Sequence, residues 1–249
     1  MDKVIKTLSG HSGSFVSLME DYKRNRMYVR KVKNVDRNVE RLRILSEAGY
    51  PVPKIYDHKY DVLDMEYLHG LDMKTYLIHN TPNDLLKFIL GIMESFKRTV
   101  TDHKDYTKTY NEKLEWLPKD FLFTKEELIN KLPKSLPQTI YHGDFTLENI
   151  LYTNPGFHLI DPVTIEYDSY LFDLAKLHQD LECKWFLRNS DVRIDTKLQY
   201  LRDCINEMHP MTYHNELLIL MLLRVLKHCE KDDDNYKFLM KEIERLWKL

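Results

Sequence analysis

The chain has 249 residues, 43% of them hydrophobic and 31% charged, which is typical of a soluble globular protein. Its 37 basic and 39 acidic side chains give a formal net charge of −2. Domains that hold nucleic acid carry a basic excess, so no nucleic-acid partner is expected. The most apolar run, Leu217 to Leu223, is too short to span a bilayer and predicts a buried helix rather than a membrane segment.

The start of the chain and its cysteines favour a cytoplasmic protein. The first residues lack the apolar stretch of a signal peptide. Cys183, Cys204 and Cys229 are odd in number and lack metal-type spacing, so a disulfide framework is not expected. The eleven histidines show no paired ligand spacing, and a histidine metal cluster is not expected either. The oligomeric state stays open.

The first part of the chain has the pattern of a small sheet interrupted by one helix. Residues 4–32 predict strands around a glycine-containing loop. Apolar residues at three-residue steps over 39–48 predict an amphipathic helix. Gly49 is suited to cap that helix, and Pro51 prevents its continuation. Residues 60–67 predict a further strand.

The rest of the chain predicts mostly helices. The expected elements are helices over 71–132 with a polar stretch near 101–109, a short strand at 139–142, a hairpin at 150–160, and helices after 171. Strands first and helices later predict an α+β protein. We expect a nucleotide-binding sheet lobe at 1–68 and a helical lobe with catalytic and substrate-binding residues at 69–249.

The strongest local signal is the pattern H-x-D-x-x-x-x-N formed by His142, Asp144 and Asn149. Asp161 follows twelve positions after Asn149. Phosphoryl transfer needs a carboxylate that orients the attacking hydroxyl, and oxygen ligands for a Mg²⁺ ion that bridges the phosphates. Asp144 suits the first task, while Asn149 and Asp161 suit the second. The alternative is a loop in which Asp144 and Asn149 hydrogen-bond their own backbone.

This ordered set resembles the aminoglycoside phosphotransferase and choline kinase superfamily, distant relatives of protein kinases. The His-Gly-Asp sequence at 142–144, where protein kinases usually carry His-Arg-Asp, favours this small-molecule branch. Ile-Asp-Pro at 160–162 and Phe-Asp-Leu-Ala at 172–175 are similar to fructosamine-kinase-like members and to proteins of sugar and capsule metabolism. The match covers roughly residues 9–180. It implies a bilobal protein-kinase-like fold with a small N-terminal antiparallel sheet lobe and a larger helical lobe.

The resemblance also implies roles for single residues. Asp144 is the catalytic base, and Asn149 and Asp161 hold the metal. Gly143 lets the loop pass close to its neighbours, and Asp173 braces that loop. The implied nucleotide-binding residues are Ser12, Gly13 and Ser14 in a flap over the phosphates, Lys31 at the α- and β-phosphates, Met65 beside the adenine, and the backbones of Glu66 and Leu68 at the base.

One position departs from the family's pattern. The family's lysine pairs with a glutamate on the first helix, and the corresponding position here falls on or near Asn38. Glu40 lies two residues further along, a turn of about 200° around a helix. Three alternatives are open: the register of the helix differs from that of the family, Glu40 takes the role of the glutamate, or the lysine–glutamate pair is absent. We expect Lys31 to pair with Glu40 rather than Asn38, with Asp36 as a third candidate, because a partly buried ammonium group needs a carboxylate.

The expected activity is that of a kinase with an alcohol group as acceptor. It would transfer the terminal phosphoryl group of ATP (or GTP), with Mg²⁺, to a sugar, amino sugar or amino alcohol. An atypical protein kinase is one alternative, although the eleven residues between Asp161 and Asp173 leave little room for an activation segment. A catalytically weak or silent nucleotide-binding pseudokinase that acts through a partner is another.

Four acidic residues follow the expected catalytic segment. They are Glu166, Asp168, Asp180 and Glu182. Carboxylates near the cleft would suit a cationic, amine-bearing acceptor through charge pairing. They would equally suit an exposed helix, so the acceptor stays open.

Overall fold

The computed structural model describes residues 2–8, 14–154, 156–231 and 233–249, and the chain forms two compact units. Unit 1 comprises Met1–Met73 and Glu148–Ile165, and unit 2 comprises Lys74–Leu147 and Glu166–Leu249. The predicted boundary after residue 68 lies close to the first change of unit. The segment Glu148–Ile165, expected in the helical lobe at 69–249, belongs to unit 1 instead.

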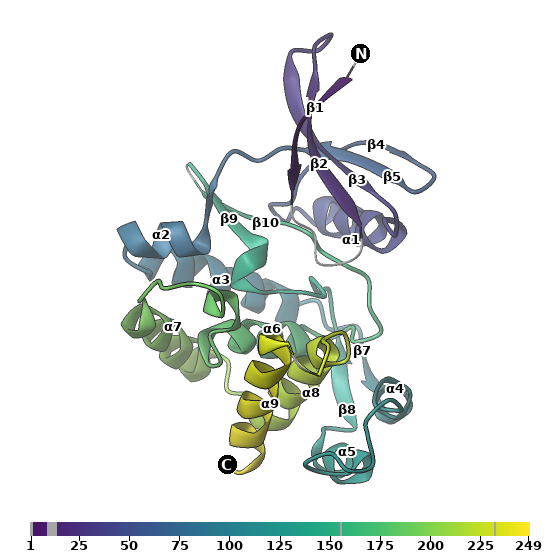
Figure 1. Cartoon of the computed structure of the whole chain (residues 1–249), viewed down its shortest axis with the longest axis vertical. Coiled ribbons are helices and arrows are strands. Elements are labelled where there is room, and N and C mark those ends of the chain that lie inside the picture. Colours follow the sequence, from purple (N-terminus) through teal and green to yellow (C-terminus); the bar gives the residue numbers. More distant parts are fainter. Residues whose placement is uncertain (1, 9–13, 155, 232) are drawn as a thin grey trace. The chain divides into compact units, whose positions relative to one another are not determined.

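Unit 1 is built on a five-stranded antiparallel sheet with the order β1-β2-β3-β5-β4 (Figure 1). Its strands are β1 (Asp2–Leu8), β2 (Phe15–Asp21), β3 (Arg26–Val32), β4 (Ile55–Lys59) and β5 (Val62–Glu66). Helix α1 (Asp36–Glu47) buries Val39, Leu42 and Leu45, as its periodicity predicts. Gly49 follows with φ +81°, a left-handed conformation that glycine adopts without steric cost.

The single strand predicted at 60–67 is one half of a hairpin. β4 and β5 pair around Tyr60, which has φ +52° and is almost fully exposed. β4 contains Asp57 and His58, and it has no buried residue. A short strand without a buried face lacks the hydrophobic alternation on which prediction from sequence depends.

A three-stranded sheet completes unit 1, with the order β10-β9-β6. It contains β6 (Leu71–Asp72), β9 (Ile150–Thr153) and β10 (Gly156–Leu159). The predicted hairpin at 150–160 is thereby confirmed. Gly70 enters β6 so close to β9 that a Cβ atom there would lie 2.6 Å from the carbonyl oxygen of Tyr152. Only glycine allows that approach of two backbones.

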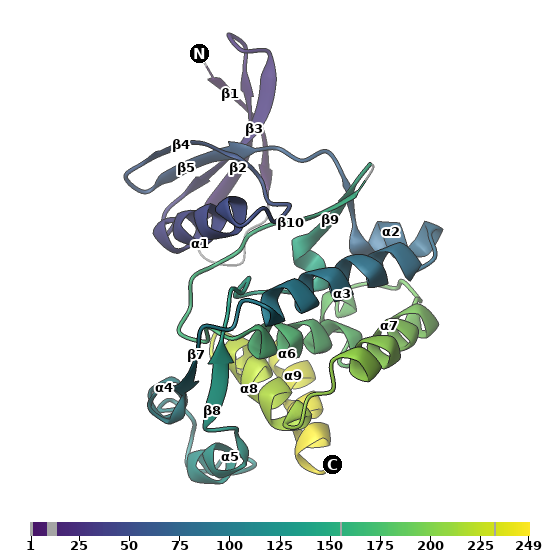
Figure 2. The ribbon, with the colours of Figure 1, turned by 180° about the vertical axis from the view of Figure 1, so that it is seen from behind.

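Unit 2 is mainly helical. Its elements are α2 (Met73–His79, whose first residue belongs to unit 1), α3 (Asn83–Lys97), β7 (Asp102–Asp105), α4 (Thr107–Lys113), α5 (Lys125–Lys131), β8 (Ser135–Gln138), α6 (Tyr170–Leu181), α7 (Asp195–Met208), α8 (His214–Leu226) and α9 (Asp234–Trp247), with 3₁₀ turns η1 (Leu147–Asn149, which crosses between the units) and η2 (Trp185–Leu187). Helix α6 packs against α3, α7 and α8, and α9 packs against α8 (Figures 1 and 2).

The core of unit 2 contains two unlike helices. In α8 the predicted apolar run Leu217 to Leu223 is buried throughout, as expected. In α6 every residue except Leu171 is buried, although several of them are polar or charged. The buried polar members of α6 are Asp173, Lys176, His178, Gln179 and Asp180. Buried polar groups need partners, so hydrogen-bond partners for these side chains are expected in the segments that surround α6.

Two short strands differ from the prediction. The strand expected at 139–142 lies earlier, as β8, and it pairs with β7 in the stretch expected to be helical or irregular. β7 consists of Asp102, His103, Lys104 and Asp105, so it too has no hydrophobic alternation.

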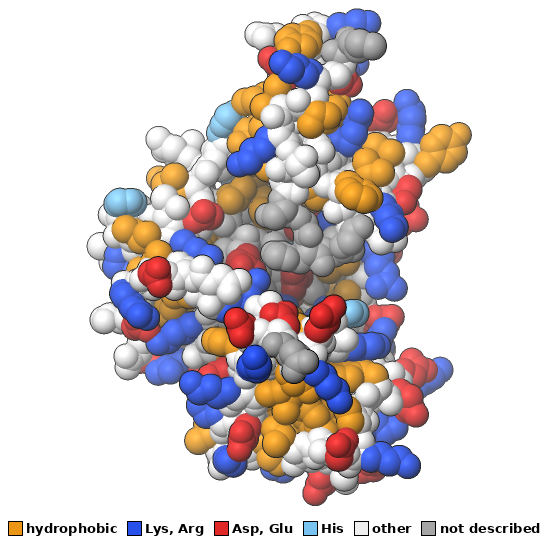
Figure 3. All heavy atoms as spheres, viewed as in Figure 1, with side chains coloured by type: hydrophobic (Ala, Val, Ile, Leu, Met, Phe, Trp, Pro, Cys, Tyr) orange, Lys and Arg blue, Asp and Glu red, His pale blue; other side chains and the backbone are white. Residues whose placement is uncertain are grey.

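Charged side chains of both signs are scattered over the face seen in Figure 3, and hydrophobic side chains gather on its lower part. Among the described residues, no helix combines the length and the apolar character that crossing a membrane requires.

Candidate active site

Helix α6 holds the predicted catalytic loop in unit 2 by hydrogen bonds to its backbone. The buried carboxylate of Asp173 accepts hydrogen bonds from the N–H groups of His142 and Gly143, the second at 2.9 Å. Asp180 accepts one from the N–H of Leu147 at 2.7 Å. Gly143 has φ +90°, which explains a glycine there. Asp173 therefore contacts the loop as the resemblance implies, and Asp180 is a second contact that the sequence reasoning missed.

Burial raises the pKa of Asp173 to about 6, although the backbone N–H groups of His142, Gly143 and Phe145 act in the opposite direction. The nearby charge of Asp144 adds to the increase. The pKa of Asp144 is shifted the other way, below its ordinary value, and carboxylates with opposite shifts accompany acid–base sites.

Asp144, the predicted base, lies beside a buried lysine. The Nζ atom of Lys176 is 2.9 Å from its Oδ1 atom, and Lys176 is 7% exposed while Asp144 is 37% exposed. Burial alone would raise the pKa of Asp144. The charge and hydrogen bond of Lys176 outweigh it, with smaller contributions from Arg224 and His142, and the pKa lies below its ordinary value. Asp144 is therefore an ionised, partly accessible carboxylate at neutral pH.

Asp161, the predicted metal ligand, is held in unit 1 by two donors. The Nζ atom of Lys31 lies 2.6 Å from its Oδ1 atom, and the Nδ2 atom of Asn38 donates to the same oxygen at 3.0 Å. Asn38 also donates to the carbonyl oxygen of Pro162 at 2.7 Å. Asp161 has φ +52°, a left-handed conformation uncommon outside glycine and of a kind that often occurs at functional sites.

The prediction that Lys31 pairs with Glu40 is wrong. Lys31 is only 3% exposed and pairs with Asp161, whereas Glu40 is exposed on α1. Asp36 is also exposed and lies near His58. The helix turns Asn38 toward Asp161, so the residue at the family's glutamate position contacts the carboxylate instead of the lysine. The carboxylate that compensates Lys31 thus comes from the segment after β10 rather than from α1.

Asn149 lies in the same unit as Asp161. It ends η1 and is partly buried, and its carbonyl oxygen accepts a hydrogen bond from the N–H of Ile160 at 2.9 Å. That bond places the backbone of Asn149 beside the residue that precedes Asp161. A carboxylate and a side-chain amide are hard oxygen donors of the type that Mg²⁺ prefers. The donor set therefore fits this ion.

The predicted nucleotide-binding residues are only partly described. Ser12 and Gly13 lie outside the described residues. Ser14 is buried and its hydroxyl donates to the carbonyl oxygen of Lys33 at 2.7 Å. Met65, Glu66 and Leu68 are partly exposed at and after the end of β5. The N–H of Glu66 already donates to the carbonyl oxygen of Lys54, so a contact from Glu66 to a base would involve its own carbonyl oxygen.

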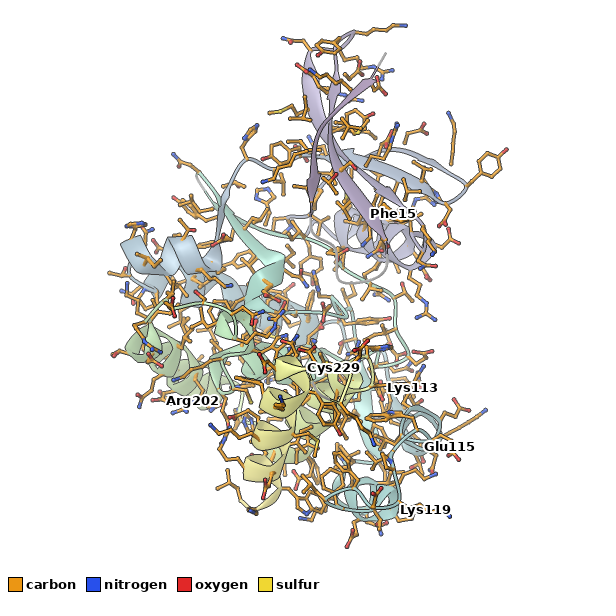
Figure 4. The ribbon with its side chains drawn as sticks, in the orientation of Figure 1. Phe15, Lys113, Glu115, Lys119, Arg202 and Cys229 are labelled. Atoms are coloured by element: carbon orange, nitrogen blue, oxygen red, sulfur yellow. The ribbon has the colours of Figure 1, made fainter. Side chains whose placement is uncertain are left out.

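The four acidic residues considered for a cationic acceptor have partners within unit 2. Asp168 pairs with Lys104 and accepts hydrogen bonds from Tyr106 and Gln138, and Asp180 is fully buried. Glu166 pairs with Lys113, which is labelled in Figure 4. Glu182 pairs with both His214 and Arg245. The idea that they lie on an exposed helix is wrong for Asp180, because it binds backbone N–H groups in the interior.

Comparisons with known proteins agree with these features. A model of the phosphotransferase enzyme family matches residues 23–214. The fold is similar to that of an ethanolamine kinase from Plasmodium vivax, with a TM-score of 0.54 and 14% sequence identity, over 99% of this chain and 82% of that one. No curated protein sequence matches. At such low identity the structural likeness shows the kinase-like α+β fold alone, whereas the family match covers most of the chain.

The matched region includes Lys31, Asp144, Asn149 and Asp161. The chain therefore belongs to the phosphotransferase enzyme family, within the aminoglycoside phosphotransferase and choline kinase superfamily that its motifs resemble.

Proposed function

We propose that the protein transfers the terminal phosphoryl group of ATP, or GTP, with Mg²⁺, to a hydroxyl group of a small molecule. Asp144 orients the acceptor hydroxyl and takes its proton. Lys31 contacts the phosphates of the nucleotide. Asn149 and Asp161 would hold Mg²⁺, which would supply positive charge to offset the negative charge of the phosphates. The cytoplasm is the proposed location, and the three free cysteines are compatible with it.

The observation that carries this proposal is the state of Asp144. It is ionised at neutral pH, partly accessible, and located on a loop whose backbone N–H groups donate hydrogen bonds to Asp173 and Asp180. Phosphoryl transfer depends on positioning and electrostatics more than on covalent chemistry, so a rigidly held carboxylate is the required element. Lys176 contacts Oδ1 and fixes the orientation of the carboxylate.

The proposed acceptor is a sugar, an amino sugar or an amino alcohol. The ethanolamine kinase with the similar fold acts, by its name, on an amino alcohol. The acidic residues of unit 2 discussed above already pair with Lys104, Lys113, His214 and Arg245 or lie in the interior. They therefore give no separate support to a cationic acceptor, and neutral sugars belong in the first test.

The second candidate is a silent nucleotide-binding protein that acts through a partner. One observation favours it: α1 presents the neutral Asn38 where the family has a glutamate, and Lys31 pairs with Asp161. In that state Lys31 is engaged with the proposed metal ligand. Binding of Mg²⁺ and nucleotide would have to redistribute these contacts before transfer.

A substrate panel separates the two candidates. Sugars, amino sugars and amino alcohols are incubated with ATP or GTP and Mg²⁺, and nucleotide consumption and phosphorylated products are measured. The proposed kinase consumes nucleotide with at least one acceptor class, and the Asp144→Asn variant does not. Binding of Mg-nucleotide without any consumption above that of the variant would favour the silent protein.

Replacing Lys176 by methionine is expected to move the acidic limb of the kcat profile to higher pH. The substitution removes the charge and hydrogen bond that lower the pKa of Asp144 and leaves burial, which raises it. A base must be ionised, so activity is lost at a higher pH. In the unmodified protein the lowered pKa makes the ionised Asp144 stabilising above its unfolded pKa, and that stability is lost as the pH falls through the folded pKa; in Lys176→Met the folded pKa is raised, so this contribution is smaller at neutral pH.

The matched control for this test is Lys113→Met, which breaks the Lys113–Glu166 pair between two partly exposed side chains. Its pH profile should match that of the unmodified protein. Identical profiles for Lys176→Met and the unmodified protein would contradict the role given to Lys176.

Asn38→Leu is expected to raise the KM for the nucleotide by about 2–10-fold, the effect of losing one hydrogen bond worth about 0.5–1.5 kcal/mol. Its amide orients Asp161 and satisfies the carbonyl of Pro162. Glu40→Gln, on the exposed side of the same helix, should leave this KM unchanged. Steady-state kinetics of both variants checks this. A larger increase in KM for Glu40→Gln than for Asn38→Leu would instead support Glu40 as the partner of Lys31.

A further inference from the structure

A cluster of three side chains in unit 2 has the composition of a metal site and no part in the proposed phosphoryl transfer. His178 and Glu182 lie one helical turn apart at the end of α6, and His214 is the first residue of α8. One potential ligand atom from each lies within 4.8 Å of the others. The two histidines are 36 positions apart in the chain, so only the packing of α6 against α8 brings them together.

His178 is the unusual member of the cluster. It is fully buried, and within the described part of the chain neither Nδ1 nor Nε2 has a hydrogen-bond partner. Its ring contacts that of His214 edge to face, with 4.5 Å between the centroids. Leaving a buried polar group unsatisfied typically costs about 1–3 kcal/mol. A buried imidazole directed at a carboxylate and a second imidazole is therefore suited to an additional ligand.

Glu182 has the environment of an oriented metal-binding carboxylate. Its Oε2 atom is 2.7 Å from Nε2 of His214, and its Oε1 atom accepts from Nη2 of Arg245 at 3.2 Å. Arg245 in turn pairs with Glu242 at 2.9 Å. The charge of Arg245 is thus balanced by Glu242, and its contact with Glu182 is the kind of outer-shell hydrogen bond that orients ligating carboxylates.

We infer that His178, Glu182 and His214 bind a divalent transition-metal ion of the zinc type. Two imidazoles and one carboxylate suit Zn²⁺ and do not suit Mg²⁺, which prefers oxygen ligands. Because the three ligand atoms lie within 4.8 Å of one another, an ion between them lies at most about 2.8 Å from each, and zinc–nitrogen bonds are about 2.0–2.1 Å. No ligand therefore has to approach the ion by more than about 0.7 Å, and the direct contact between His214 and Glu182 opens to admit it. Side-chain rotation provides that movement.

The consequence is structural. The ion would join the end of α6 to the start of α8, while the same helix α6 carries Asp173, Lys176 and Asp180, which contact the catalytic loop. Zinc binding should therefore stabilise the unit that contains Asp144. The inference does not depend on the acceptor or on the proposed activity.

The test uses the full-length protein treated with a chelator and then dialysed against ZnCl₂. Elemental analysis should find one zinc ion per chain, and the Tm should rise by roughly 5 °C when free zinc is about a hundredfold above its Kd. Substitution by Co²⁺ should produce the visible absorption of a nitrogen- and oxygen-coordinated ion. Absence of bound zinc after dialysis would overturn the inference.

Variants locate the ion. His214→Gln, at a partly exposed ligand, should lose the zinc and the Tm increase, and Glu182→Gln supplies the same test should the first variant fail to fold. His228→Gln, an exposed histidine after α8, should bind zinc normally. Asp161→Asn should also retain the zinc, which separates this site from the proposed Mg²⁺ ligands. Equal zinc binding by His214→Gln and the unmodified protein, or loss in Asp161→Asn, would contradict the inference.

Discussion

Replacing Asp144 by asparagine is expected to lower the rate of phosphoryl transfer by about 10²–10⁴-fold, equivalent to about 3–5 kcal/mol of transition-state stabilisation. The amide keeps the size of the side chain but cannot take the proton of the acceptor hydroxyl. Mg-nucleotide affinity should change little, because the proposed phosphate and metal contacts come from Lys31, Asn149 and Asp161. Single-turnover kinetics measures the first effect, and nucleotide titration measures the second.

Two controls make this result specific. Asp203→Asn removes an exposed carboxylate that pairs with Arg202 on α7, labelled in Figure 4, and should leave the rate unchanged. Thermal melting of Asp144→Asn shows whether the loss of the partner of Lys176 has damaged the fold. Near-normal turnover in a folded Asp144→Asn protein would contradict the assignment of Asp144 as the catalytic base.

Replacing Asp161 by asparagine should weaken Mg²⁺-dependent nucleotide binding by at least the 10–100-fold that loss of an outer-shell metal contact costs. The amide can still accept from Lys31 and Asn38, but the negative charge that attracts the metal is gone. Asn149→Ala removes a neutral ligand and should have a smaller effect. Titration of nucleotide with and without Mg²⁺ distinguishes the metal-dependent part.

The Asp161 variant also loses the charge that compensates Lys31. Breaking a fully buried pair costs about 3–5 kcal/mol, and the cost here should be lower because Asp161 is 46% exposed. Asp57→Asn, an exposed residue paired with Lys59 in the same unit, is the matched control. Unchanged metal dependence in both Asp161→Asn and Asn149→Ala would mean that the metal ligands lie elsewhere.

The elements that the sequence predicted well are those with a strong hydrophobic pattern. The helix over 39–48, the apolar run of α8 and the hairpin at 150–160 all appear where expected. β4 and β7 were missed because they are short and contain no buried residue, and their pairing is decided by the neighbouring strand. The candidate loop was recognisable because phosphoryl transfer requires particular residue types at short spacings.

By itself, the sequence determined the family, the α+β class and the candidate residues Asp144, Asn149 and Asp161, because these depend on local patterns along the chain. Tertiary structure decided which distant side chains meet. It turned Asn38 rather than Glu40 toward Asp161, and it placed Lys176 against Asp144. Such contacts depend on helix rotation and on packing between segments far apart in sequence, and residues two positions apart on a helix face opposite sides.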